Sequence, residues 1–259
     1  MNRITKKFQE LQSLNKKAFI GYLTAGDPDI SKTEEFVYAL EEGGADIIEL
    51  GIPFSDPLAD GPVIQAAGQR ALNAGVTVDK ILKLVKDIRE NTNIPLLFLV
   101  YYNTIIIYGK EKFINRCEEI GIDGLIIPDL PYEERDELEV IMDYEKLCLI
   151  PLVAPTSKDR INKIIKGCNG FVYCVSSLGV TGEKSSFYKN IDDYLKEVKK
   201  NSHLPIAVGF GISNKDDIIK LQKNVDGFIV GSAIVREINM SGGDKIALTE
   251  YIKTLTNTN

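Results

Sequence analysis

The stretch IELGIPFSDPLADGP, residues 48–62, contains three carboxylates in surroundings that favour chemistry over simple solvation. Glu49 interrupts an apolar, strand-like run, and Asp56 and Asp60 follow it among prolines. Ile and Leu neighbours would raise the pKa of Glu49, and a carboxyl group with a pKa near neutrality can both donate and accept a proton. The stretch therefore predicts acid–base chemistry centred on Glu49.

Each of these carboxylates also has a structural interpretation. Glu49 could be satisfied inside the fold by a backbone amide or a neighbouring lysine. Asp56 and Asp60 could form turns, and Asp60 could cap a helix that begins just after it. The residues alone leave both aspartates open between a structural and a catalytic role.

Glycines near the C-terminus indicate a second part of a site. Gly209-Phe210-Gly211 and Gly231-Ser232 each follow an apolar run, and backbone amides without bulky side chains can wrap around a phosphate group. A short helix after Gly231 would add the dipole of its N-terminus. We expect phosphate binding at these glycines; tight turns with no ligand are the alternative.

The segment SSLGVTGEKSS, residues 176–186, is rich in glycine and polar residues. It predicts a non-helical, mobile lid over the site, in which Thr181 could offer a hydroxyl group to a carboxylate or to substrate. An ordinary surface loop is the alternative.

The elements that must position these residues follow from the hydrophobic pattern. Short runs rich in Val, Ile and Leu alternate with longer amphipathic segments, which is typical of βα units around parallel strands. Eight strands are predicted, at residues 18–26, 46–53, 95–103, 124–130, 148–155, 171–176, 205–212 and 227–234. Eight such units in 259 residues predict an α/β fold, a single (β/α)8 TIM barrel domain over residues 1–259 with extra short helices.

Barrel enzymes react at the carboxyl ends of their strands, where Glu49 and the two glycine motifs, Gly209-Phe210-Gly211 and Gly231-Ser232, are expected to meet. Side-chain alternation along residues 46–53 points Glu49 toward the barrel interior. Between strands, residues 31–44 predict a helix with Ser31 as its cap, Glu34 completing a capping box, and a glycine pair at its end.

Composition excludes several classes of function. A formal net charge of -6 disfavours general nucleic-acid binding. The N-terminal residues lack the pattern of a secretory signal, and no run approaches the length of a membrane span, so we expect a cytoplasmic protein. The four cysteines form no C-x-x-C pair, which favours packed, reduced thiols over disulfides or zinc ligands.

Some residue types are scarce where catalysis is expected. No predicted strand carries Lys, which disfavours Schiff-base chemistry, and the sole histidine, His203, precedes the strand at 205–212 and so lies at a strand entrance. The near absence of His, with no cluster of Cys, disfavours a zinc-dependent aldolase, and no metal site is expected. These features favour a lyase or isomerase whose substrate serves as its own electron sink.

Several motifs, taken together, resemble those of the tryptophan synthase alpha chain family. They are ELGIPFSDPLADGP with IQAAGQRAL, then YYN, GLIIPDLP, GVTG, GFGI and GS after successive strands, and they span essentially the whole chain in the family's order. The resemblance implies cleavage of indole-3-glycerol phosphate to indole and glyceraldehyde 3-phosphate. Glu49 and Asp60 then match the two catalytic carboxylates, Glu49 moving protons and Asp60 stabilising positive charge on the indole ring.

The resemblance also implies substrate-binding residues. Gly182, Gly211 and Ser232 would face the phosphate beside Phe210, with Gly209 and Gly231 in the same motifs. The indole pocket and the lid contact would be formed by Tyr22, Leu99, Tyr101, Tyr173 and Thr181. Tyr22 stands where some relatives have Phe, and the lid lacks an arginine found in others.

The family works with a beta chain, which joins indole to serine using pyridoxal phosphate. The resemblance therefore implies a beta-chain partner in an alpha2-beta2 assembly, no cofactor in this chain, and Pro53 and Asp56 as partner contacts. Two alternatives stay open: a free-standing lyase with the same site, and a catalytically silent activator. Retention of both Glu49 and Asp60 disfavours the silent activator.

Overall fold

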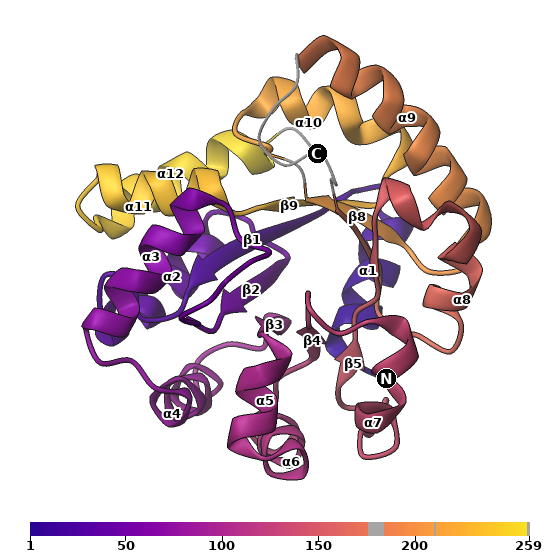
Figure 1. Cartoon of the computed structure of the whole chain (residues 1–259). Coiled ribbons are helices and arrows are strands. Elements are labelled where there is room, and N and C mark those ends of the chain that lie inside the picture. Colours follow the sequence, from indigo (N-terminus) through magenta and orange to yellow (C-terminus); the bar gives the residue numbers. More distant parts are fainter. Residues whose placement is uncertain (176–183, 210, 258–259) are drawn as a thin grey trace.

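The computed structural model describes residues 1–175, 184–209 and 211–257. Nine parallel strands form one curled sheet in the order β5-β4-β3-β2-β1-β9-β8-β7-β6, and Figure 1 shows them in the centre with the helices around them. The strands are β1 (Ala18–Thr24), β2 (Ile47–Gly51), β3 (Leu96–Leu99), β4 (Gly124–Ile126), β5 (Cys148–Leu149), β6 (Leu152–Val153), β7 (Val172–Val175), β8 (Ile206–Gly209) and β9 (Gly227–Val230).

The nine strands occupy eight barrel positions because β5 and β6 are two halves of the predicted strand 148–155. The backbone N–H of Ile150 donates to Leu125 on β4 at 2.9 Å, whereas the carbonyl of Pro151 accepts from Tyr173 on β7 at 2.9 Å. Pro151 has no N–H to continue the ladder, which explains the interruption. The strand thus joins β4 to β7, and the predicted (β/α)8 barrel is confirmed.

Helices surround the strands and close one end of the barrel. They are α1 (Arg3–Ser13), α2 (Ile30–Glu42), α3 (Pro62–Asn73), α4 (Val78–Ile88), α5 (Tyr102–Tyr108), α6 (Lys110–Ile120), α7 (Asp136–Glu139), α8 (Ile161–Ile165), α9 (Lys184–Asn201), α10 (Lys215–Leu221), α11 (Ser232–Met240) and α12 (Lys245–Thr256). Short 3-10 turns are η1 (Tyr132–Glu134), η2 (Pro155–Arg160) and η3 (Gln222–Asn224).

Side-chain alternation divides the core into two layers. Ile48 and Leu50 of β2 point outward into the large core beneath the helices, whereas Ile47 belongs to an inner cluster. The inner cluster contains Ile20, Leu97 and other alternate strand residues, with apolar residues of α1 packed against them. Glu49 lies two residues after Ile47 on the same strand, so its side chain points to the same face, inside the barrel.

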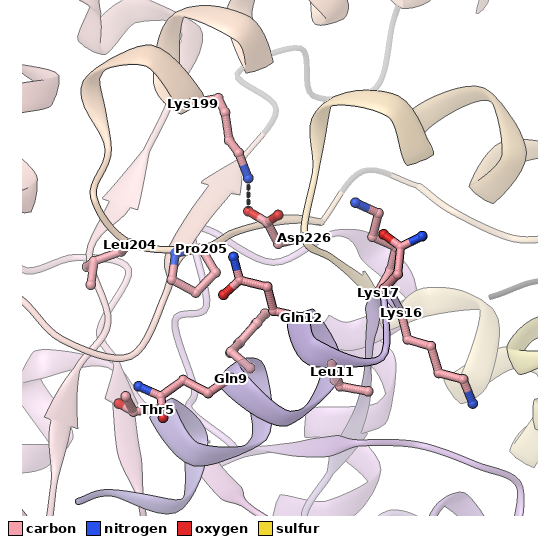
Figure 2. A pocket seen from close by; sticks show the side chains of 12 residues that line it. Thr5, Gln9, Leu11, Gln12, Lys16, Lys17, Lys199, Leu204, Pro205 and Asp226 are labelled. Atoms are coloured by element: carbon pink, nitrogen blue, oxygen red, sulfur yellow. Dashed lines mark hydrogen bonds and ion pairs between the residues drawn. The ribbon is translucent and has the colours of Figure 1, made fainter.

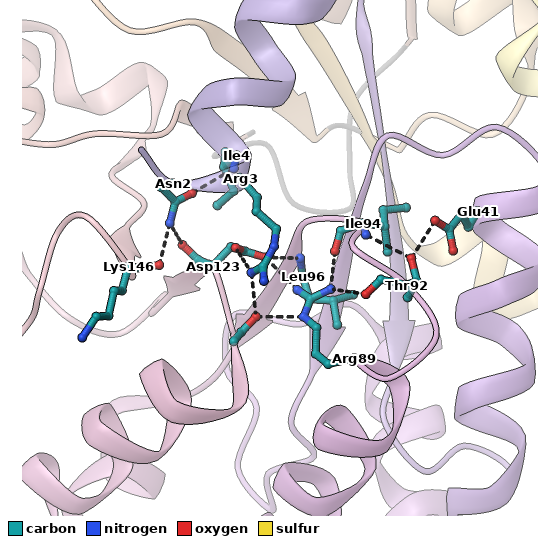
Figure 3. A network of polar contacts seen from close by, with 11 residues as sticks. Asn2, Arg3, Ile4, Glu41, Arg89, Thr92, Ile94, Leu96, Asp123 and Lys146 are labelled. Carbon is teal, nitrogen blue, oxygen red and sulfur yellow. Dashed lines mark hydrogen bonds and ion pairs between the residues drawn. The ribbon is translucent and has the colours of Figure 1, made fainter.

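A polar network holds α1 against the strand entrances (Figure 3). Asp123, just before β4, accepts from Arg3 at 2.8 Å and from Arg89 at 2.7 Å, and also from the backbone N–H of Leu96 at 2.9 Å. The amide of Asn2 donates to the carbonyl of Asp123 at 2.8 Å, and its oxygen caps α1. The buried carboxylate is thus fully partnered, and this end of the barrel is a structural end.

Several predicted boundaries were wrong. The strand 95–103 ends at Leu99, and α5 begins at Tyr102. The strand 227–234 ends at Val230 because the helical turn starting at Ser232 takes over. The expected non-helical segment 176–186 overlaps α9, which begins at Lys184; Ser and Lys are tolerated in a first helical turn, and the sequence beyond them has helical periodicity.

The predicted cap of the second helix was also wrong. Asp29 caps α2 and accepts from the N–H of Ser31 at 2.9 Å, so the helix starts one residue before Ser31. Glu34 accepts from the hydroxyl of Tyr38 at 2.8 Å instead of closing a capping box. The end of the helix at Gly43 is confirmed.

The predictions for the cysteines and for His203 are confirmed. All four cysteines are free and buried, and His203 is exposed before β8. Within the part of the chain that the structure describes, no helix is long and apolar enough to cross a membrane. In that same part, no group of three or more His, Cys, Asp or Glu side chains is arranged to hold a metal ion.

Candidate active site

Glu49 lies on β2 inside the barrel, opposite Tyr22 of β1 and Leu97 of β3 in the strand register. Its side chain is buried, and its Oε2 atom has no hydrogen-bond partner within the part of the chain that the structure describes. Burial raises the pKa of Glu49 to about 8, and the negative charge of Asp60 adds to the effect. Among the described residues no amide or lysine satisfies this carboxyl group, so the structural interpretation of Glu49 is not supported.

Asp60 lies at the end of the loop that joins β2 to α3. Burial raises the pKa of Asp60 to about 6, while a hydrogen bond from the hydroxyl of Tyr101 opposes the increase. Tyr101 also accepts from the backbone N–H of Ala59 at 3.0 Å and stacks on Phe54 with ring centroids 5.0 Å apart. Tyr101 therefore contacts the loop at Phe54, at Ala59 and at the carboxylate of Asp60, and these contacts hold the loop over the site.

The helix-cap interpretation of Asp60 is wrong. Gly61 occupies the N-cap position of α3, with no hydrogen bond from a capping side chain. Asp60 uses its backbone carbonyl to accept from Gln65 at 2.9 Å. Its carboxylate is thus left for Tyr101 and the cavity.

Asp56 differs from Asp60 in its surroundings. It is exposed, and the hydroxyl of Ser55 donates to its carboxylate. Pro53, nearer the strand, is half-buried. Asp56 therefore lies on the outer surface of the same loop that carries Asp60 inward.

The two carboxylates share a cavity of about 220 Å³ at the carboxyl ends of the strands. Residues from β1, β2, β3, β7, β8 and β9 contribute to it, as expected of a barrel site. The predicted residues that line it are Tyr22, Glu49, Asp60, Leu99, Tyr173, Gly209, Gly211, Gly231 and Ser232. Thr181, Gly182 and Phe210 lie outside the described residues.

Two tyrosines stand inside the barrel beside Glu49. Burial raises the pKa of Tyr22 and of Tyr173 well above the ordinary value, so both phenols are neutral at physiological pH. A Cβ atom on Gly51 would lie 2.1 Å from the hydroxyl oxygen of Tyr22, and one on Gly209 would lie 2.7 Å from that of Tyr173. Gly209 therefore also makes room for a tyrosine, in addition to the phosphate contact expected of it.

The remaining glycines give the cavity a second, polar end. Gly211 has φ of +44°, a left-handed conformation that favours glycine, and a Cβ atom there would meet no atom within 4 Å. Gly231 is the N-cap of α11, and Ser232 is the first residue of that helix. Free amide groups of a helix N-terminus thus face the cavity beside an open glycine turn, an arrangement suited to an anion.

Arg236 lines the same cavity, and the sequence interpretation missed it. It lies one helical turn beyond Ser232 on α11, so the two side chains occupy the same face of the helix. The spacing S-A-I-V-R directly after Gly231 was the available signal. Of the described residues that line the cavity, Arg236 is the only one with a cationic side chain.

A larger hollow, of about 370 Å³, lies at the opposite end of the barrel (Figure 2). It lies between α1 and the segments that lead into β8 and β9, and Gln9, Gln12 and Lys16 line it. Its carboxylate, Asp226, is paired with Lys199 and accepts from the N–H of Ile206 at 2.9 Å. This hollow lacks an unpartnered buried acid and lies at the strand entrances, so it is a poor candidate for the catalytic site.

Comparisons with known proteins agree on one family. The family model described as tryptophan synthase alpha chain matches residues 8–258. The tryptophan synthase alpha chain of Alkaliphilus metalliredigens is 53% identical over 253 residues, which covers 98% of this chain and 95% of the relative.

Solved structures agree with this result. Tryptophan synthase subunit alpha from Legionella pneumophila has a TM-score of 0.90 and 35% identity, covering 100% of this chain and 98% of the other. A chain from a study of mutual activation in the tryptophan synthase α2β2 complex of Pyrococcus furiosus has a TM-score of 0.87 and 36% identity, covering 93% and 98%. Sequence, fold and site agree, and the chain belongs to the tryptophan synthase alpha chain family.

Proposed function

We propose that this chain, as a tryptophan synthase alpha subunit, cleaves indole-3-glycerol phosphate into indole and glyceraldehyde 3-phosphate. The observation that carries the proposal is the buried carboxyl group of Glu49, whose Oε2 atom has no hydrogen-bond partner among the described residues, in the same cavity as Asp60. A pKa of about 8 keeps Glu49 protonated at neutral pH, and a pKa of about 6 leaves Asp60 ionised. One acid and one anion therefore face the substrate.

Cleavage begins with proton transfer from Glu49 to carbon 3 of the indole ring. The ring becomes an indoleninium cation, and its positive charge gathers on the ring N–H. The ionised carboxylate of Asp60, which is half-buried, stabilises this cation, and such an interaction is stronger there than in bulk water. Tyr101 holds Asp60 in place by its hydrogen bond.

Glu49 also performs the second proton transfer, which completes the reaction. Glu49, now ionised, accepts the proton of the glycerol hydroxyl group next to the ring, and that carbon becomes the aldehyde. The electrons of the broken carbon–carbon bond return to the ring, which restores neutral indole. Glu49 ends protonated, so the proton it gave and the proton it took balance.

The cavity suits the two ends of this substrate. Tyr22, Leu99 and Tyr173 supply an apolar and aromatic wall for the ring near Glu49. Gly211, Ser232 and Arg236 lie at the end proposed to hold the phosphate. The protonated ring accepts the electrons itself, so we propose that this chain supplies no cofactor to the cleavage.

The proposal is tested by measuring the rate at which the purified chain releases indole from indole-3-glycerol phosphate. We expect indole at a low rate from the chain alone and a much higher rate when a tryptophan synthase beta chain is added. Full activity without a partner would support the free-standing lyase instead. No indole under either condition would contradict the proposed function.

The partner proposal concerns the outer surface of the loop after β2. Asp56 lies there beside Leu58, which is 94% exposed, an apolar side chain that a partner would cover, and Pro53 is half-buried at the strand end of the loop. Complexes of tryptophan synthase among the related structures support a beta-chain partner. We propose an alpha2-beta2 assembly in the cytoplasm, with pyridoxal phosphate held only by the beta chain.

The two carboxyl groups predict a bell-shaped pH dependence of kcat/KM. Activity requires ionised Asp60, so it should fall as the pH drops through about 6. Activity also requires protonated Glu49, so it should fall as the pH rises through about 8. Initial rates of indole release from pH 5 to pH 10 measure both limbs. A rate that keeps rising above pH 9 would contradict the acid role of Glu49.

The cation Arg236 predicts a defect in binding. Arg236→Met should raise KM for indole-3-glycerol phosphate about threefold to tenfold, because an exposed ion pair contributes modestly, and should leave kcat nearly unchanged. Weaker inhibition by inorganic phosphate should accompany it. Lys223→Met, an exposed change in the same half of the barrel, is the control. An unchanged KM would remove Arg236 from the phosphate site.

A further inference from the structure

α3 forms one wall of the site and follows Asp60 directly. The helix begins at Pro62, and Ile64 lines the cavity. Its inward face belongs to a small apolar cluster formed by Tyr22, Ala67, Val235, Val63, Ile64 and Leu99. The position of Asp60 over the cavity therefore depends on how firmly α3 is held.

An ion pair holds α3 farther along the helix. The Nε and Nη2 atoms of Arg70 donate to the two carboxylate oxygens of Asp27 at 2.6 and 2.7 Å, which is a bidentate contact. The Asp27 side chain is 5% exposed and that of Arg70 is 38% exposed. Bidentate pairing fixes the direction of the guanidinium group as well as its distance, so it orients the helix.

The loop that carries Asp27 is itself fixed to the strand of Glu49. The N–H of Ala25 donates to the carbonyl of Gly51 on β2 at 2.9 Å. The N–H of Gly26 donates to the hydroxyl of Thr33 at 2.8 Å. Gly26 has φ of +88°, and a Cβ atom there would lie 2.2 Å from a methyl carbon of Val76, just beyond α3. Asp27 is thus anchored in the same frame as Glu49.

We infer that the Asp27–Arg70 ion pair is a positioning element that fixes α3 to the loop after β1 and so holds Asp60 across the cavity from Glu49. The inference rests on the proposed function of this site. Arg70 and Asp27 are positioning residues because neither lines the cavity. Loss of the pair lets α3 relax outward, which separates the two carboxylates and admits water to Glu49.

The pH profile distinguishes positioning from simple support of the fold. Among the described residues, the titratable groups that face Glu49 are Asp60 from the loop before α3, Tyr22 from β1 and Tyr173 from β7. Burial is the main cause that raises the pKa of Glu49, and because both tyrosines are neutral, Asp60 is the charge that adds to it. Outward movement of α3 weakens both causes and moves the basic limb of kcat/KM to lower pH.

The test compares Arg70→Met and Arg70→Lys with the wild-type chain in the presence of the beta chain. Arg70→Met should lower kcat about tenfold to a hundredfold with KM changed less than about threefold, since misplacing a catalytic group affects the chemical step. The basic limb should move to lower pH. Arg70→Lys, which keeps the charge but not the bidentate contact, should lie between.

Arg116→Met is the matched control, because Arg116 forms an exposed ion pair with Glu119 on α6 and should change neither kcat nor the pH profile. If Arg70→Met does not fold, the double variant Asp27→Asn with Arg70→Gln removes the pair without leaving a buried charge. A folded variant with wild-type kcat and an unmoved basic limb would overturn the inference while the proposed function stands.

Failure of the proposed function itself would be distinguishable. If the wild-type chain releases no indole, the inference can still be tested by ¹³C NMR titration of the Glu49 carboxyl group. The carboxyl signal is assigned by its absence from the spectrum of Glu49→Gln. The titration then measures whether the Asp27–Arg70 pair affects the pKa of Glu49. The pKa of Glu49 should be lower in Arg70→Met than in the wild-type chain. Equal values would overturn the inference whatever the reaction is.

Discussion

Replacing Glu49 with Gln should abolish indole release, with a loss of at least about a thousandfold in kcat, because one carboxyl group performs both proton transfers. The amide has nearly the same size as the carboxyl group and fits the same buried position. Unlike the acid, it cannot protonate carbon 3 of the ring or accept the hydroxyl proton. Steady-state indole release from indole-3-glycerol phosphate in the presence of a beta chain measures the effect.

The Glu49→Gln experiment needs evidence that the variant keeps its fold and its phosphate site. Binding of inorganic phosphate should be unchanged, and the neutral amide should not lower thermal stability, since it removes no ion pair among the described residues. Glu35→Gln, which removes only a partly exposed ion pair with Lys32 on α2, is the control and should keep wild-type activity. Residual activity within tenfold of wild type would show that another group moves the protons.

The Asp60→Asn variant should lose about a hundredfold to a thousandfold in kcat, a smaller effect than that expected for Glu49→Gln. Asn keeps an oxygen that can accept the hydrogen bond from Tyr101, so the loop should stay in place. The variant lacks the negative charge that stabilises the cation formed on the ring. The loss should therefore appear in kcat, with KM changed little.

The pH profile provides a second reading of the Asp60 variant. The acidic limb of kcat/KM, which reports ionisation of Asp60, should disappear in Asp60→Asn. The pKa of Glu49 should fall because the charge of Asp60 is gone. Asp87→Asn, an exposed change on α4, is the control. Full activity with an intact acidic limb would assign charge stabilisation to another residue.

The sequence predicted the position of Glu49 because strand alternation is a local rule. Apolar neighbours on both sides of Glu49 identified a buried strand, and the period of two then fixed which face the carboxyl group occupies. The glycine motifs were likewise readable, because the left-handed turn at Gly211 favours glycine and a helix begins at Ser232. These signals lie within a few residues of the feature that they predict.

The sequence left Asp60 undecided because its environment is made by distant residues. Tyr101 accepts from Ala59 and bonds to Asp60 across 41 positions of the chain, and Phe54 stacks on the same ring. The sequence of the loop does not predict that Tyr101 will contact it. The Asp27–Arg70 pair escaped notice for the same reason, since the two residues are 43 positions apart.

The interrupted fifth strand and the role of Arg236 were missed for a different reason. A proline inside an apolar run weakens a strand, but the sequence does not predict where the ladder of backbone hydrogen bonds is interrupted. Residues 148–155 were therefore predicted as one continuous strand. Arg236 looked like an ordinary exposed helical residue, as it would be if the cavity did not reach α11. In both cases the packing of neighbouring elements decides the outcome.

A structure of the chain with a phosphorylated indole analogue of the substrate bound tests the central claim most directly. The account predicts the indole ring between Glu49 and Asp60, with carbon 3 within hydrogen-bonding distance of the Glu49 carboxyl group and the ring N–H toward Asp60. The phosphate should lie against Gly211, Gly231 and Ser232. An analogue bound at the opposite end of the barrel, or with its ring turned away from both carboxylates, would contradict the account.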